Sequence, residues 1–214
     1  MEKIKRLNGI PEIYIEPAEG TDEWYVGVND NGCDLYEVEE IFKEEHYFQG
    51  TECYLIHYPD GEVYKPFNTQ ANVYVNKPIW DNGKFGILVV DFNLKKIFIY
   101  HYLPESNKLK EIAEIPLSTV KDCYNLILDS SPLILGRSEN NGIYEIVWPV
   151  KKEIQIEDTE TLLYRDEDVL YFSQWVEDPE YHEYIIKRDM KTGKVLEKVS
   201  GMLYKMPNGT IWKV

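Results

Sequence analysis

Short runs in which apolar and polar residues alternate recur along the whole chain. They are explicit at 12–16 (EIYIE), 23–28 (EWYVGV), 71–76 (ANVYVN), 95–102 (KKIFIYHY), 152–157 (KEIQIE) and 210–214 (TIWKV). A period of two indicates a strand with one buried face, and the Val, Ile and Tyr in these runs favour the same structure. Residues 34–45 (DLYEVEEIFKEE) are the best candidate for a short helix, because they space Leu35, Val38 and Phe42 along one helical face.

Dipeptides that favour tight turns separate these runs. They are Asn31-Gly32, Asp60-Gly61, Asn82-Gly83, Asn141-Gly142, Thr192-Gly193 and Asn208-Gly209. Asn-Gly and Asp-Gly supply the positive φ that two-residue hairpins require, so we expect consecutive strands to pair antiparallel. About nineteen strands at intervals of roughly 8 to 12 residues indicate a propeller, a sandwich or a barrel.

Grouping the strands in fours gives sheets at 24–67, 71–117, 123–158 and 161–200, with strands left over at both chain ends. We therefore predict an all-β, antiparallel β-propeller of about five small blades in a single domain, 1–214, closed by the N- and C-terminal strands. A β-sandwich or barrel, and an α+β arrangement, are the alternatives. Two similar hairpins, HYPDGEVYK (57–65) and KMPNGTIWK (205–213), agree with a repeated unit but are out of phase in this grouping.

A second repeated pattern carries a resemblance to known proteins. Residues 185–199 (IIKRDMKTGKVLEKV) contain an Asp-x-x-Thr-Gly-Lys turn between two strand patterns, and residues 89–100 (VVDFNLKKIFIY) repeat it without the glycine. This hairpin resembles those in the blades of quinoprotein-like and YVTN-type β-propellers. The resemblance covers 15 and 12 of the 214 residues. It implies the fold alone, with no quinone cofactor and no activity.

Charge and composition limit the classes of partner. The chain has 38 acidic and 23 basic residues and a net charge of −15, so we expect neither nucleic acid nor an anionic membrane as a partner. No apolar stretch is typical of a leader or long enough to span a bilayer, and the three cysteines form no CxxC pair. These features predict a soluble, cytoplasmic protein with free thiols, and an acidic surface of this kind is common in small bacterial proteins.

Motifs for catalysis or metal binding are weak. The four histidines are scattered, and the sequence has no G-x-S-x-G, no Gly-rich phosphate loop and no S-x-x-K. Residues 29–37 (NDNGCDLYE) place acids around a glycine, but their order does not match a calcium loop and a hairpin turn explains them better. We expect no metal and no cofactor. A small, glycosidase-like hydrolase with carboxylates converging on the central channel is the alternative function, by analogy with propeller glycosidases.

We expect the functional face where the longest loops gather. In a propeller, the loops between second and third strands and those between blades emerge on one side. With the grouping above these loops are 43–50, 68–70, 119–122, 158–160 and 177–181. They carry the predicted binding residues His46, Tyr47, Gln70, Lys121, Asp122, Glu177 and Tyr181. The sequence thus predicts a non-catalytic propeller that binds a protein partner, or a small-molecule or carbohydrate ligand, through this face, with an accessory or immunity protein as a further possibility.

Overall fold

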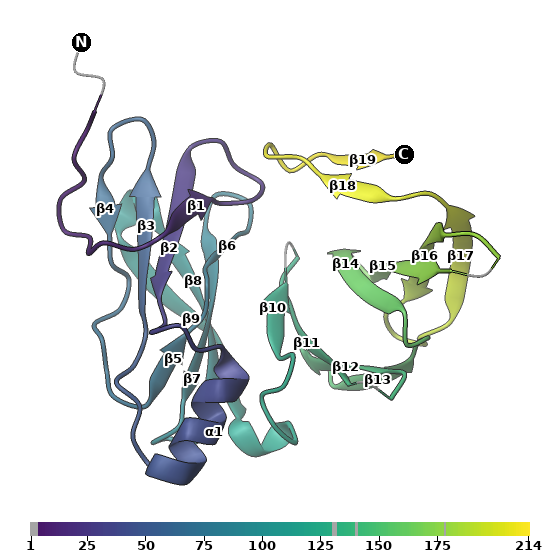
Figure 1. Ribbon diagram of the computed structural model, residues 1–214, viewed down its shortest axis with the longest axis horizontal. Helices are drawn as coiled ribbons and strands as arrows, with labels where there is room; N and C mark the ends of the chain where they lie inside the picture. The colour runs from purple at the N-terminus through teal and green to yellow at the C-terminus, as the bar shows by residue number, and fades with distance from the viewer. Residues whose placement is uncertain (1–3, 130–131, 140, 178) are drawn as a thin grey trace. The chain divides into compact units, whose positions relative to one another are not determined.

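The computed structural model describes residues 4–129, 132–139, 141–177 and 179–214, and it divides the chain into two compact units. The first unit is Met1–Cys123 and the second is Tyr124–Val214. Figure 1 shows the first unit in purple to teal and the second in green to yellow. Each unit is described by itself.

The first unit holds two antiparallel sheets whose strands follow one another in chain order. The first sheet has the order β1-β2-β3-β4, and the second has β5-β7-β8-β9 with β6 also paired to β7. Because β5 and β6 pair with successive parts of β7, they act as one interrupted strand. The elements are β1 (Ile15–Pro17), β2 (Trp24–Asn29), α1 (Leu35–Glu45), β3 (Glu52–His57), β4 (Val63–Tyr64), β5 (Val73–Val75), β6 (Ile79–Trp80), β7 (Phe85–Asp91), β8 (Lys96–Leu103), the 3₁₀ turn Pro104–Ser106, β9 (Lys108–Pro116) and the 3₁₀ turn Leu117–Thr119.

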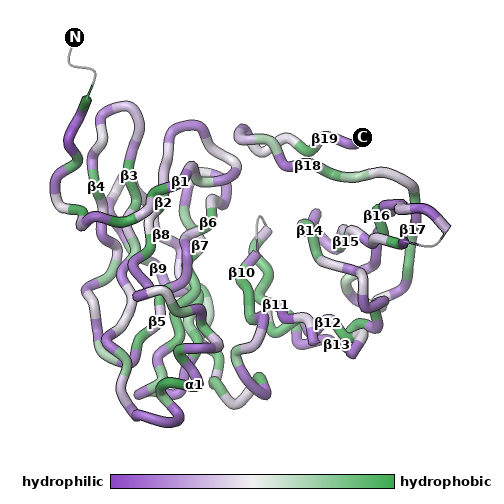
Figure 2. Tube along the Cα trace, in the orientation of Figure 1, coloured by the Kyte–Doolittle hydropathy of each residue, from purple (hydrophilic) through white to green (hydrophobic). Residues whose placement is uncertain are grey.

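The second unit repeats the same construction and adds a hairpin. Its sheets have the orders β10-β11-β12-β13 and β14-β15-β16-β17, and β18 pairs with β19. The strands are β10 (Ile127–Asp129), β11 (Ile134–Glu139), β12 (Ile143–Trp148), β13 (Lys152–Gln155), β14 (Glu160–Asp166), β15 (Val169–Val176), β16 (His182–Asp189), β17 (Val195–Ser200), β18 (Leu203–Lys205) and β19 (Ile211–Lys213). Figure 2 shows hydrophobic stretches along the strands of both units and hydrophilic residues in many of the turns.

Four successive up-and-down sheets of this kind are the blades of a propeller-type architecture. The all-β prediction is therefore confirmed, and the last three blades fall close to the predicted boundaries. The expectation of about five blades is wrong, because the described residues form four blades and one separate two-stranded hairpin.

The predicted joining of the chain ends in a fifth sheet is also wrong. Strand β1 pairs with β2, in the register Ile15↔Gly27, and Tyr204 of β18 pairs with Trp212 of β19. Only a short turn separates β1 from β2, so their pairing closes a small loop and costs far less chain entropy than pairing strands at opposite ends of the sequence. Strand β1 therefore belongs to the first blade, which begins at residue 15 rather than 24.

Helix α1 replaces the hairpin turn expected at residues 29–37. Asp34 caps the helix by accepting a hydrogen bond from Glu37 N, and the Glu37 side chain accepts one from Asp34 N in return. Asn31 and Gly32 do have positive φ, but they lead into this cap instead of reversing the chain between two strands. The helix candidate at 34–45 is confirmed.

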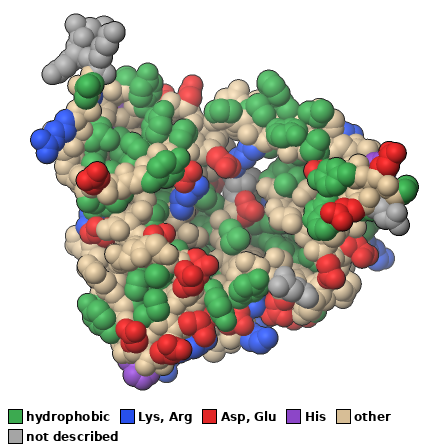
Figure 3. Space-filling view, viewed as in Figure 1, with side chains coloured by type: hydrophobic (Ala, Val, Ile, Leu, Met, Phe, Trp, Pro, Cys, Tyr) green, Lys and Arg blue, Asp and Glu red, His purple; other side chains and the backbone are tan. Residues whose placement is uncertain are grey.

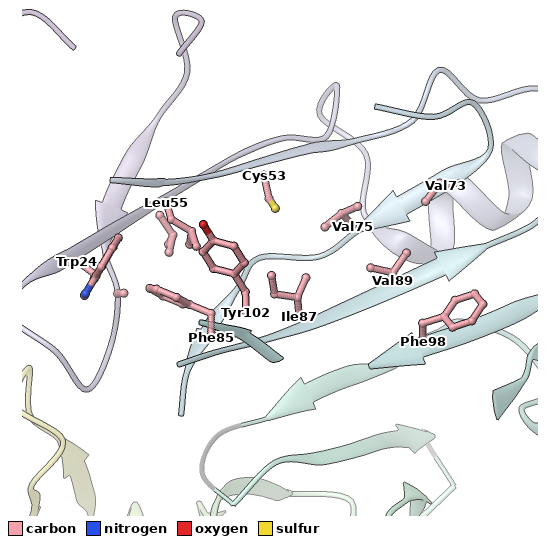
Figure 4. Packing of buried hydrophobic residues seen from close by; sticks show 12 residues of the cluster. Trp24, Cys53, Leu55, Val73, Val75, Phe85, Ile87, Val89, Phe98 and Tyr102 are labelled. Atoms are coloured by element: carbon pink, nitrogen blue, oxygen red, sulfur yellow. The ribbon is translucent and has the colours of Figure 1, made fainter. Parts of the chain in front are cut away.

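Each unit has its own hydrophobic core. In the first, side chains from β2 and β3 face those from β5, β7 and β8, with Leu55, Phe85 and Ile87 fully buried (Figure 4). In the second, Leu170 and Phe172 of β15 belong to a cluster with apolar residues of β11, β12, β13 and β16. Burial of large apolar side chains at about 25 cal/mol per Å² is the main stabilising term in such cores. No helix in the described part of the chain is long and apolar enough to cross a membrane.

Candidate functional site

Three of the predicted loops lie close to α1 in the first unit. Asn72 N donates a hydrogen bond to Phe48 O (2.7 Å) and Asn72 Oδ1 accepts one from Phe48 N (2.7 Å), so the loop after α1 pairs with the loop before β5. A side chain on Gly50 would place its Cβ 2.1 Å from the carbonyl oxygen of Gln70, so only glycine allows this approach. The structure thus brings the segment of His46 and Tyr47 beside the segment of Gln70.

His46 and Tyr47 sit at the C-terminal end of α1. His46 has a left-handed backbone (φ 57°) and its N–H donates to Phe42 O, which terminates the helix. The neighbouring residues Tyr47 and Phe48 differ sharply in exposure, at 58% and 5%. Tyr47 is therefore an exposed aromatic side chain on a segment that Phe48 anchors in the core.

Glu52 holds the loop that leads to Gln70. Its carboxylate accepts hydrogen bonds from Lys65 Nζ (2.6 Å), from the Thr69 hydroxyl and from the Tyr54 hydroxyl (3.0 Å). The hydrogen bond from Lys65, followed by that from Thr69, lowers the pKa of Glu52 to about 2. This carboxylate is committed to structure and leaves little capacity for a ligand.

Lys121 and Asp122 lie where the first unit ends. The next residue, Cys123, donates its N–H to Glu39 Oε2 (2.8 Å), and Glu39 belongs to the buried side of α1. This hydrogen bond ties the segment of Lys121 and Asp122 to the helix. Five of the predicted residues are therefore on loops that are attached to α1 or adjoin its C-terminal end: His46, Tyr47, Gln70, Lys121 and Asp122. Figure 3 shows several acidic side chains over the region of α1.

Glu177 and Tyr181 belong to the second unit, on the loop between β15 and β16; residue 178 of that loop lies outside the described residues. Tyr181 is 61% exposed, and its hydroxyl donates to the carboxylate of Glu183. That hydrogen bond raises the pKa of Tyr181, and the charge of Glu177 adds to the effect. The two residues share one loop, and the position of this loop relative to Tyr47 stays a prediction.

A pocket that sequence reasoning missed lies at the edges of the first two blades. It has a volume of about 320 Å³, and we call it the β1–β5 pocket. Thr51 fixes the edge of β5 beside the first blade, because its hydroxyl donates to Val75 O (3.0 Å) and accepts from Val75 N. The lining residues are Tyr14, Glu16, Val26, Gly27, Val28, Asp30, Tyr74, Asn76 and Lys77.

The β1–β5 pocket combines an apolar floor with polar groups from both blades. Val26 is 1% exposed and Val28 packs against the core of the unit. Asp30 Oδ1 accepts a hydrogen bond from Gly32 N (2.9 Å), which orients the carboxylate. Burial raises the pKa of the Tyr74 hydroxyl, and the charges of Asp30 and of acidic residues at the start of α1 raise it further.

Lys77 and Glu16 form an ion pair on the pocket wall, with 2.9 Å between Nζ and Oε1. Both side chains are more than a third exposed, so water screens this pair and it contributes little to stability. One hint of the pocket is present in the sequence, namely the acidic segment around Asp30. Nothing in the sequence shows that Asp30 and Tyr74 line one pocket, because that depends on how two blades meet.

One other polar pair has the form of a catalytic dyad. His101 Nε2 lies 2.9 Å from Asp81 Oδ2, and Lys84 Nζ is 3.8 Å from the same oxygen. Burial, followed by the charge of Lys84, lowers the pKa of His101. The pair links the β6–β7 turn to β8.

The described residues contain no group of three or more His, Cys, Asp or Glu side chains placed to hold a metal ion. Cys33, Cys53 and Cys123 are present as thiols rather than disulfides. Burial raises the pKa of the Cys53 thiol to about 12, so this residue is an apolar packing element of the core.

Comparison with known proteins places the chain in no family. No family model matches the sequence, and no curated protein matches it. Solved structures that resemble it include a chain of the mitotic checkpoint complex (12% identity, TM-score 0.44, 92% of this chain and 58% of that one) and dipeptidyl peptidase 4 of Porphyromonas gingivalis (12%, 0.41, 89% and 32%). A third is a tail fibre of Staphylococcus aureus phage P68 (14%, 0.37, 92% and 41%). The chain thus spans less than two thirds of each of these proteins.

Proposed function

We propose that this protein is a non-catalytic binding module of the propeller type, and that the β1–β5 pocket is its site for a small polar ligand. One observation carries the proposal: hydrogen-bonding groups of Asp30, Tyr74 and Asn76 reach one cavity from two different blades over an apolar floor. Small-ligand sites in proteins commonly combine an apolar lining with a few convergent polar groups, and the pocket volume lies at the lower end of their usual range.

The pocket suits binding better than hydrolysis. Its two carboxylates, Glu16 and Asp30, have different surroundings, because Glu16 is paired with Lys77 and Asp30 accepts from a backbone N–H. A glycosidase needs one carboxylic acid held protonated by its environment and a second carboxylate opposite it. An exposed ion pair does not supply that difference.

The experiment is a binding survey with four small probes that differ in charge: n-butylammonium, n-butanol, butyrate and D-glucose. Amide chemical shifts of the ¹⁵N-labelled protein are followed during each titration. We expect at least one probe to cause saturable shifts at Gly27 and Val28. Asn76→Trp, which fills the cavity, should abolish them, whereas Lys108→Trp on the exposed start of β9 should leave them unchanged. If none of the four probes gives saturable shifts at these amides, the proposal is wrong.

A second candidate function is recognition of a protein partner through the loops predicted from the sequence. The supporting observation is the exposure of two tyrosines, Tyr47 at 58% and Tyr181 at 61%, since tyrosine is enriched among residues that dominate binding energy at interfaces. Each tyrosine is replaced singly by alanine and the dissociation constant for a purified partner is measured. Wild-type affinity in both variants, with unchanged melting temperatures, would remove this candidate.

A further inference from the structure

The charges around the β1–β5 pocket are unbalanced. Glu16 and Asp30 each contribute one negative charge, and Lys77 contributes the one positive charge among the lining residues. Lys77 is paired with Glu16, so Asp30 is left without a cationic partner among the described residues. Asp34 and Glu37 at the start of α1 add negative charge nearby, although their carboxylates are also used in capping the helix. The pocket is therefore electronegative.

Tyr74 offers a further polar group to a ligand in the pocket. Its side chain is 5% exposed and lines the pocket, and its hydroxyl makes no hydrogen bond to any residue that the structure describes. It is not among the buried polar side-chain atoms of the described residues that lack a hydrogen-bond partner, so the Tyr74 hydroxyl reaches solvent in the pocket and is open to a ligand. Asp30 lines the same pocket, and burial, followed by the charge of Asp30, raises the pKa of the hydroxyl. It can accept a hydrogen bond from a donor that also reaches Asp30.

We propose that the β1–β5 pocket takes an organic cation, namely a protonated primary amine on a short apolar chain. The ammonium group would donate to the carboxylate of Asp30 and to the hydroxyl of Tyr74, and the carbon chain would lie against the half-buried Val28. This inference rests on the proposed function of the pocket and names the class of its ligand.

Three features of the pocket favour an amine over the other classes of small ligand. An anion would face Asp30 without compensation from Lys77, which Glu16 already holds. A neutral alcohol can make the same hydrogen bonds, but bonds from a charged donor to a carboxylate are roughly twice as strong. At the rim, Tyr14 is 81% exposed, and its ring offers a face that attracts a cation.

The test compares n-butylammonium with n-butanol at pH 7, using the amide shifts of Gly27 and Val28 in the full chain. We expect butylammonium to bind at least ten times more tightly than butanol and to weaken as salt concentration rises. Asp30→Asn should reduce its affinity about tenfold, in line with the loss of one charge-assisted hydrogen bond. Tyr74→Phe should reduce it by a smaller factor, of about three.

Glu105→Gln is the matched control, because it removes one negative charge from an exposed turn outside the pocket. It should leave the affinity for butylammonium unchanged. An equal loss in Asp30→Asn and Glu105→Gln would show general attraction to an acidic protein and would overturn the inference. Saturable binding of butanol, butyrate or glucose in the pocket, with none for butylammonium, would overturn the inference and leave the proposed function intact. Absence of saturable binding for all four probes would remove both.

Discussion

Two hairpins in different units show how one local pattern is supported in two ways. In β7–β8 and in β16–β17, an aspartate accepts a hydrogen bond from the backbone N–H three residues later, from Leu94 N to Asp91 (2.9 Å) and from Thr192 N to Asp189 (2.6 Å). The residue after that donor has a positive φ in both turns, 55° at Lys95 and 74° at Gly193. The local geometry is thus the same, with or without glycine.

The two turns differ in what holds them to the rest of their units. The carbonyl of Lys95 accepts a backbone hydrogen bond from Leu117 N (2.9 Å). The carbonyl of Gly193 instead accepts from Arg188 Nη1 (3.1 Å), and Arg188 is bound through two further nitrogens by the carboxylate of Glu160. The first turn is also held by Asn93, whose side chain donates to Ala71 O (2.9 Å) and accepts from Asn72 Nδ2 (2.9 Å), whereas the second depends on a buried ion pair. The comparison shows that a repeated hairpin sequence does not by itself specify its anchor.

The largest expected effect comes from breaking the buried pair. Glu160 is 2% exposed and Arg188 10% exposed in their side chains, and a lone buried guanidinium is costly. We expect Glu160→Leu to lower the free energy of unfolding by about 3–5 kcal/mol, and Arg188→Met to do the same. The double variant should be much closer to the wild type, because no charge is left unpaired. Urea unfolding of the wild type, the two single variants and the double variant measures these free energies. A double variant that loses the sum of the two single losses would contradict the prediction.

The next effect is at Gly193. An alanine there would hold an unfavourable positive φ and place its Cβ 3.2 Å from Cγ2 of Ile154. We expect Gly193→Ala to cost about 1–2 kcal/mol in the free energy of unfolding. Gly83, which also has a positive φ but open space around its Cβ position, is the matched control and separates the backbone cost from the contact with Ile154. An equal loss in Gly83→Ala would show that the contact contributes nothing.

Introducing a glycine at the matching position should stabilise the turn between β7 and β8. Lys95 holds a positive φ without being glycine, so Lys95→Gly relieves that strain. We expect a gain of about 0.5–1 kcal/mol, measured by thermal and urea unfolding. Lys191→Gly, at an exposed turn position without positive φ, should give no gain. A loss of stability in Lys95→Gly would mean that its side chain contributes more than the backbone strain costs.

The smallest effect is the pH dependence of the Asp189 turn. Hydrogen bonds from the Thr192 hydroxyl and then from Thr192 N lower the pKa of Asp189 below its ordinary value of 3.8. Folding therefore favours the ionised form, so this stabilisation is present above about pH 3.8 and is lost as the pH falls through the lowered pKa. We expect the difference in melting temperature between the wild type and Asp189→Asn to shrink over that interval. A difference that is constant from pH 6 to pH 2.5 would exclude this origin.

Part of the fold could be predicted because it depends on neighbours in the sequence. The alternating runs, the Asp-Gly and Asn-Gly turns and the spacing of Leu35, Val38 and Phe42 specify strands, hairpins and α1 through local propensity and short loops. The positions of His46, Tyr47 and Gln70 on adjoining loops also follow from strand order. The number of blades could not be predicted from strand order, because the strands left over at the chain ends carry no information about which strands they pair with.

The sequence by itself determined an acidic, all-β protein of consecutive antiparallel blades, since residues close in the chain decide alternation, turn type and charge. Only the tertiary structure decided the β1–β5 pocket and the Arg188–Glu160 anchor. Asp30 and Tyr74 are 44 positions apart, and their approach depends on how Thr51 joins two blades. Such contacts are selected by the packing of whole sheets against one another, and no local pattern in the chain records that packing.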